Sequence, residues 1–111
     1  MAYAINGLSA SYSPQSQQWE DIITGFDHAD RPLFAAAKHI NLEFDQCSIA
    51  HYGQWAALHG TSLTSIELLN MDGTSYTAYT GSNIYLALEE RPSFQAGNVT
   101  GFRIKVHNVV P

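Results

Sequence analysis

Several residue types are scarce in this chain of 111 residues, and each scarcity excludes a class of protein. Cys47 is the only cysteine, so no internal disulfide can form and the fold must rest on packing alone. Only five residues are basic against ten acidic ones, which gives a net charge of −5 at pH 7. The basic residues are scattered along the chain, so no patch could follow a phosphate backbone, and we expect no direct binding of nucleic acid.

Long apolar segments are also missing from the chain. No stretch approaches the roughly 20 apolar residues that span a bilayer. The N-terminal stretch MAYAINGLSA has neither the basic nor the apolar segment of a secretory signal peptide. We therefore expect no membrane partner.

The remaining composition is that of an ordinary globular protein. Hydrophobic residues make up 45% of the chain and charged residues 14%, which predicts a single domain over residues 1–111 with one buried core. Aromatic residues reach 12%. This aromatic content, combined with the low charge, indicates that another molecule covers part of the surface.

Apolar residues alternate with polar ones over much of the chain, which is typical of strands with one buried face. The longest such stretch covers residues 64–89 and predicts a β-meander, because Asp72-Gly73 in its interior favours a tight hairpin turn. Residues 36–45 and 102–107 follow the same rule. The residues predicted to face the interior are Ile40, Leu42, Phe44, Ile66, Leu68, Ile84, Leu86, Leu88, Phe102, Ile104 and Val106.

Helix signals occur at two places. Ser48 is a suitable N-cap for a short helix over residues 49–59, and Gly60 suits its C-terminal end. Residues 14–26 are ambiguous, because a Ser-Pro helix start and apolar residues at helical spacing compete with side chains that also suit a strand. The chain is therefore predicted to be an α+β fold, mainly antiparallel β (a β-sandwich or a partly open barrel), with one or two short helices. Residues 90–98 are predicted to form a loop.

Catalytic and metal-binding patterns are incomplete in this sequence. Cys47 and His51 are four residues apart, with Asp45 and His59 nearby, but the second close pair of ligands that a structural zinc site commonly uses is missing. Asp27-His28 could serve in acid–base chemistry, yet neither this pair nor Cys47 lies in a known catalytic signature. We expect no cofactor, no metal ion and no enzymatic activity.

Exposed aromatic residues could bind a sugar instead. Tyr76, Tyr79 and Tyr85 fall in the predicted meander, where they could stack on a carbohydrate or pack across strands. A small carbohydrate-binding module of the β-sandwich type, similar to a lectin, is therefore the alternative function.

The order of the predicted elements resembles the tail-tube-type fold of bacteriophage structural proteins. The resemblance covers residues 39–109: a strand, a short helix, a hairpin at Asp72-Gly73, a long alternating strand and a final strand. It implies a non-enzymatic subunit of a homo-oligomer in a virion, as a tail-tube-like, head–tail joining or capsid-decorating protein. The implied partners are copies of itself and other virion proteins, and the implied location is the virion, with the cytoplasm as the alternative.

Two segments are predicted to contact a neighbouring copy. Residues 1–12 form an extended N-terminal arm that crosses onto the open sheet edge of a neighbour. Residues 90–98 present an aromatic side chain beside an arginine, a combination typical of interface anchors. The predicted interface residues are Tyr3, Ile5, Leu8, Tyr12, Arg91 and Phe94.

Overall fold

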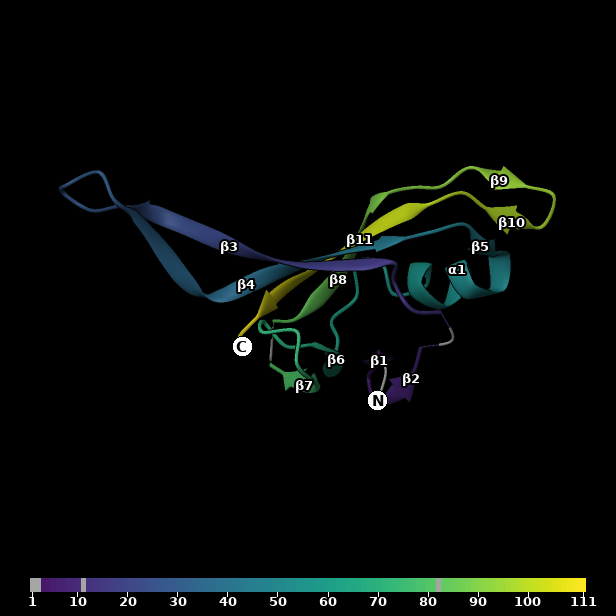
Figure 1. Cartoon of the computed structure of the whole chain (residues 1–111), viewed down its shortest axis with the longest axis horizontal. Coiled ribbons are helices and arrows are strands. Elements are labelled where there is room, and N and C mark those ends of the chain that lie inside the picture. Colours follow the sequence, from purple (N-terminus) through teal and green to yellow (C-terminus); the bar gives the residue numbers. More distant parts are fainter. Residues whose placement is uncertain (1–2, 11, 82) are drawn as a thin grey trace.

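The structure is a computed structural model that describes residues 3–10, 12–81 and 83–111. The molecule is elongated, with extents of 55 × 27 × 26 Å, and consists mainly of antiparallel strands in three sheets with one short helix (Figure 1). The predicted α+β fold, dominated by antiparallel sheet, is therefore confirmed. None of the three sheets closes into a barrel among the described residues.

The largest sheet, which contains the longest strands, has four strands in the order β3-β4-β11-β8. A second sheet of four strands packs beneath it in the order β2-β1-β6-β7, and a smaller sheet has the order β5-β10-β9. The strands are β1 (Ala4–Ile5), β2 (Leu8–Ser9), β3 (Ser16–Phe26), β4 (Pro32–Phe44), β5 (Cys47–Ser48), β6 (Ser65–Leu69), β7 (Tyr76–Thr80), β8 (Tyr85–Glu90), β9 (Phe94–Gln95), β10 (Asn98–Val99) and β11 (Phe102–Val109).

The core lies between the two larger sheets and the helix. All eleven residues that the alternation predicts to face the interior are at most 8% exposed. Trp55 of the helix α1 (Ile49–Ala56) is fully buried beside them, and its ring lies 4.9 Å from that of Phe44. The period-two rule therefore identifies the buried face of each of these strands correctly.

Helix α1 confirms the predicted cap and begins where the sequence places it. The Oγ of Ser48 accepts a hydrogen bond from the backbone N–H of His51, as an N-cap should. The helix ends at Ala56, earlier than predicted, and Gly60 has the expected positive φ of 75°. The chain leaves the helix early because residues 59–63 run along the outer edge of β8, where Gly60 N–H donates to Leu86 O at 2.7 Å.

The predicted meander is wrong in its third strand. Residues around Asp72-Gly73 do form the β6–β7 hairpin, with Gly73 at a φ of 70°. Strand β8, however, leaves β7 and pairs with β11 in the other large sheet. Alternation determines which side chains are buried, and both sheets bury their faces against the same core, so the pattern cannot tell which sheet a strand joins.

Residues 14–26 are largely strand, and the helix interpretation is wrong. Strand β3 pairs antiparallel with β4 from Ser16 opposite Glu43 to Phe26 opposite Pro32. This long pairing also draws residues 33–37, which have helical propensity, into β4. Tertiary pairing overrides local preference here. Beyond the pairing of Lys38 with Val109, β4 leaves its β11 partner, so residues 22–37 form a two-stranded ribbon, called the β3–β4 ribbon below.

The predicted loop over residues 90–98 contains a hairpin. Strands β9 and β10 pair with each other, and the turn between them places Ala96 at a φ of 45° and Gly97 at a φ of 87°. Two successive positive φ angles define the turn that matches the twist of a two-residue hairpin. The sequence did not indicate it because alanine is unusual at such a position.

The predicted N-terminal arm is a hairpin of the chain's own sheet. Met1, Ala2 and Ser11 lie outside the described residues, but Asn6 and Gly7 have φ angles of 52° and 81° and join β1 to β2. Strand β1 also pairs with β6 of the same chain, so it does not reach a neighbour. The prediction overlooked Asn-Gly, which is the strongest short-range signal for a hairpin.

Candidate assembly surface

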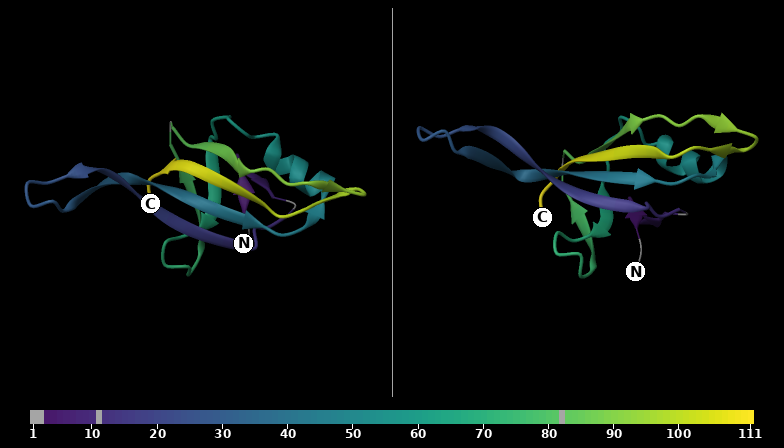
Figure 2. Two further views of the ribbon diagram at one scale, coloured as in Figure 1. Left: turned by 90° about the horizontal axis from the view of Figure 1, so that it is seen from above. Right: turned by 45° about the horizontal axis from the view of Figure 1, so that its top comes forward.

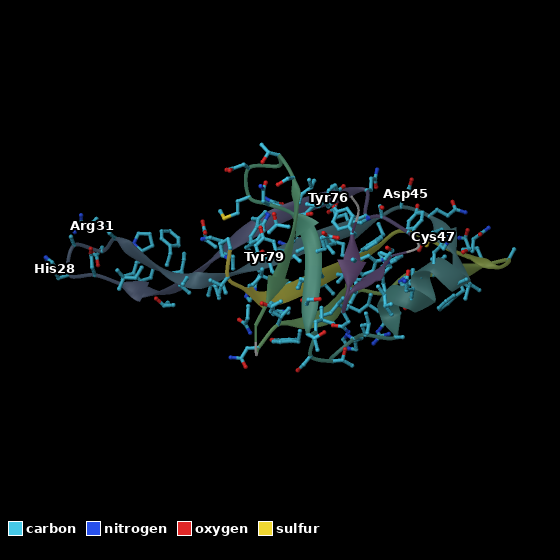
Figure 3. All side chains as sticks on the ribbon, turned by 90° about the horizontal axis from the view of Figure 1, so that it is seen from below. His28, Arg31, Asp45, Cys47, Tyr76 and Tyr79 are labelled. Atoms are coloured by element: carbon cyan, nitrogen blue, oxygen red, sulfur yellow. The ribbon has the colours of Figure 1, made fainter. Side chains whose placement is uncertain are left out.

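The β3–β4 ribbon projects from the body along the long axis of the molecule (Figures 1 and 2). Its turn is held by Asp27, whose Oδ1 accepts hydrogen bonds from the backbone N–H groups of Ala29 (2.8 Å) and Arg31 (3.0 Å). These backbone hydrogen bonds, led by the one from Arg31, hold the pKa of Asp27 below its ordinary value. Figure 3 shows His28 and Arg31 at the far tip. The tip is thus a defined turn that places the ribbon away from the core.

Large apolar side chains are exposed along the ribbon. Ile23 is 53% exposed and stands opposite Phe34, which is 55% exposed. Phe26 and Leu33 are 64% and 48% exposed. Single exposed apolar residues are common on protein surfaces, whereas a cluster of them indicates a site of interaction.

The ribbon carries no unpaired acidic or basic side chain along its strands. At its base Asp21 forms an ion pair with Lys38, and at its tip Asp27 pairs with Arg31 at 2.9 Å. Between these pairs, residues 22–26 and 32–37 contain no charged residue. Depletion of charge is the compositional mark of the centre of a protein–protein interface, because no ion must be desolvated there.

The predicted interface residues lie elsewhere. Tyr3 and Ile5 are each only 5% exposed, so they belong to the core of their own chain and are wrong as surface contacts. Tyr12 is half-buried and stacks on His51 with ring centroids 5.2 Å apart. Leu8 is 72% exposed. The body of the chain, and not a neighbour, therefore accounts for most of the N-terminal contacts.

Phe94 and Arg91 are both exposed, and strand β9, which begins at Phe94, lies near the end opposite the ribbon (Figure 1). Phe94 is 63% exposed, but its ring also meets Tyr52 edge-on with centroids 5.8 Å apart. It therefore has a local partner, which the sequence did not predict. A contact of Phe94, Arg91, Leu8 or Tyr12 with another subunit stays a prediction.

The outer face of the largest sheet is polar and internally paired. Glu20 accepts hydrogen bonds from the Nδ2 of Asn41 at 2.8 Å and from the Nζ of Lys105 at 3.5 Å. The hydrogen bond from Asn41, followed by the charge of Lys105, lowers the pKa of Glu20. Arg103 lies 3.2 Å from Glu90. Paired charges of this kind are typical of a solvent-exposed face, whereas the strands of the ribbon are uncharged and apolar.

Two histidines meet on this polar face. The rings of His39 and His107 lie 4.5 Å apart, and Tyr85 stacks on His107 at 4.4 Å. Burial is the main cause that lowers the pKa of both imidazoles; the charge of Lys105 adds to it for His39, and His39 adds to it for His107. Glu20 and Glu89, the acidic groups that face the pair, act in the opposite direction.

Stability should therefore fall in weak acid. Each imidazole takes up a proton in the unfolded chain at its ordinary pKa of 6.5, but only at lower pH in the fold. The pair's contribution to the free energy of unfolding is complete above the ordinary pKa of 6.5 and is lost as the pH falls below it. Denaturant titrations at several pH values should show that the free energy of unfolding decreases as the pH falls below 6.5. His107→Asn should weaken this pH dependence. His28→Asn, at the exposed ribbon tip, should leave the pH dependence unchanged. Equal pH dependence in the unmodified chain and in both variants would contradict the role given to the histidine pair.

The other chemical candidates are mostly packed within the fold. Cys47 is 7% exposed, and burial raises the pKa of its thiol. Among the described residues, no group of three histidine, cysteine, aspartate or glutamate side chains could hold a metal ion. Tyr79 is buried edge-on against Trp19, and Tyr76 packs edge-on against Tyr3, both on β7 in Figure 3.

Tyr85 is more accessible than the other two predicted sugar contacts. It is 38% exposed and stacked on His107, so one face of its ring is already covered. The three tyrosines therefore do not form a common exposed platform. Tyr85 forms a cross-strand pair with His107 of β11, whereas Tyr79 packs on Trp19 of another sheet and Tyr76 packs on Tyr3.

Comparison with protein-family models, with curated proteins and with solved structures finds no match for this chain. In the part of the chain that the structure describes, no helix has the length and apolar character needed to cross a membrane.

Proposed function

We propose that this protein is a non-enzymatic structural subunit that assembles with further copies of itself. The observation that carries the proposal is the β3–β4 ribbon, in which four of the large apolar side chains, Ile23, Phe26, Leu33 and Phe34, are each about half exposed or more. A two-stranded ribbon without further support is at best marginally stable in water. Contact with another subunit would bury these side chains and stabilise the ribbon.

Copies of the same chain are the simplest partner. Most soluble oligomers are homo-oligomers with closed symmetry. The ribbon extends from one end of a molecule that is 55 Å long and only 27 × 26 Å across, so it can reach the body of an adjacent copy. An interface between two different parts of the same chain generates rings, or filaments where the rotation does not close.

Within this class we propose a virion component that is tail-tube-like, head–tail joining or capsid-decorating. The support is the order of elements over residues 39–109: the end of β4, helix α1, the β6–β7 hairpin, β8 and β11. Other virion proteins would then be further partners. The assembly proposal itself rests on the ribbon and does not depend on this assignment.

The double variant Ile23→Thr/Phe34→Thr should release folded monomers. Threonine keeps the β-branched character that suits a strand, while it removes apolar area from the face where the two residues stand opposite each other. Buried interface anchors commonly contribute about 1–4 kcal/mol each, so the dissociation constant should rise at least about tenfold. Sedimentation velocity measures the mass, and circular dichroism confirms that the sheet persists.

The matched control is Ile49→Thr, which changes an apolar residue of similar exposure (45%) at the start of α1. This variant should assemble like the unmodified chain. The proposal is wrong if the ribbon variant keeps the full assembled mass.

A further inference from the structure

The edges of the largest sheet differ in how they are covered. Residues 59–63 cover the outer edge of β8: Leu86 and Thr61 are hydrogen-bonded backbone to backbone, and Leu63 N–H donates to Ile84 O at 2.8 Å. Strand β3 forms the other edge and pairs only with β4 among the described residues. Alternate residues of β3 thus direct their backbone N–H and C=O groups to an open side, where another strand could add.

A groove of about 400 Å³ lies beside this open edge. Its apolar lining residues are Trp19, Leu69 and Met71, of which Met71 is 49% exposed. Its walls are held together, because Gln17 Nε2 and Trp19 Nε1 both donate to Leu69 O, at 2.7 and 3.3 Å. The groove is therefore preformed. It is lined by Gln17, Gln18, Trp19, Leu69, Asn70, Met71, Asp72 and Gly73.

The ribbon has a second open edge, on β4, whose apolar side chains suit the apolar surface of the groove. Residues 33–37 of β4 lie beyond its last pairing with β11, so on that side they have no partner strand among the described residues. This segment, LFAAA, contains no charge and no proline, the usual devices that keep an edge from pairing. The ribbon projects away from the body, so it cannot fill the groove of its own chain (Figure 2).

We infer that residues 33–37 of one copy add as a strand to the β3 edge, over residues 16–20, of a second copy. Phe34 of the incoming segment then enters the groove between Trp19 and Met71 of the receiving copy. Backbone hydrogen bonds supply the pairing, and the buried aromatic ring sets the register. The inference rests on the proposed self-assembly and names the surface that receives the ribbon.

A mixing experiment tests this pairing of two different surfaces. Ile23→Thr/Phe34→Thr keeps an intact groove but lacks the apolar ribbon face. Met71→Glu keeps an intact ribbon but places a charge in the groove, at an exposed turn where the fold tolerates it. Each variant alone should be monomeric, because both surfaces are needed in every contact. An equimolar mixture should form a one-to-one heterodimer, detected by native mass spectrometry, with slower amide hydrogen exchange over residues 16–20.

The control for the added charge is Ile49→Glu, at a residue of similar exposure (45%) that does not line the groove. It should assemble normally. A Met71→Glu protein that assembles like the unmodified chain, or a mixture that stays monomeric, overturns the groove assignment while the proposed function stands. An unmodified chain that is itself monomeric overturns the proposed function and this inference together.

Discussion

Replacing Trp55 with alanine should lower the free energy of unfolding by about 3–5 kcal/mol, the usual range for removing a buried aromatic side chain. Trp55 is fully buried, and its Nε1 donates a hydrogen bond of 2.9 Å to the carbonyl of Tyr12. The substitution leaves both a cavity and an unpaired carbonyl. Because domains are stable by only about 5–15 kcal/mol, this loss should be visible as a large shift of the denaturation midpoint.

Chemical denaturation followed by circular dichroism measures the effect. Trp55→Phe is the informative comparison, since it retains most of the ring volume but not the hydrogen bond, and it should lose less stability than Trp55→Ala. A loss below about 1 kcal/mol for the alanine variant would mean that the helix does not pack on the core as described.

Ile104→Ala should cost about 2–5 kcal/mol. Ile104 lies on the central strand β11, is 1% exposed, and stands opposite Leu42 on one side and Leu88 on the other. The surrounding strands are held by pairing on both sides of β11 and cannot collapse into the space that the alanine leaves.

Arg103→Ala is the matched control on the adjacent position of the same strand. Arg103 is exposed and pairs with Glu43 and Glu90 at 3.7 and 3.2 Å. Exposed ion pairs contribute little, so its loss should stay within about 1 kcal/mol. Equal losses for the two variants would contradict the inward and outward assignment along β11.

The core could be predicted because one local rule governs it. Residues such as Ile66, Leu86 and Ile104 alternate with polar neighbours, and a strand with one buried face needs nothing more. The N-cap at Ser48 followed from equally local chemistry. Which sheet received β8 could not be predicted, because that choice depends on pairing between segments far apart in the sequence.

The candidate assembly surface was not predicted because no local rule distinguishes its exposed apolar residues from buried ones. Ile22, Ile23 and Phe26 fit a buried helix stripe as well as a strand, and both interpretations place large apolar side chains inside. Only the pairing of β3 with β4 beyond the end of β11 leaves Ile23 and Phe26 exposed and Ile22 half-buried. The residues predicted to contact a neighbour lie mainly in residues 1–12, where the turn at Asn6-Gly7 folds the chain back on itself.

Sedimentation velocity of the unmodified chain over a concentration series tests the central claim, self-assembly through the ribbon, most directly. The claim predicts species whose mass is a multiple of 12.2 kDa at high micromolar concentration. A single species of 12.2 kDa at every concentration would contradict it.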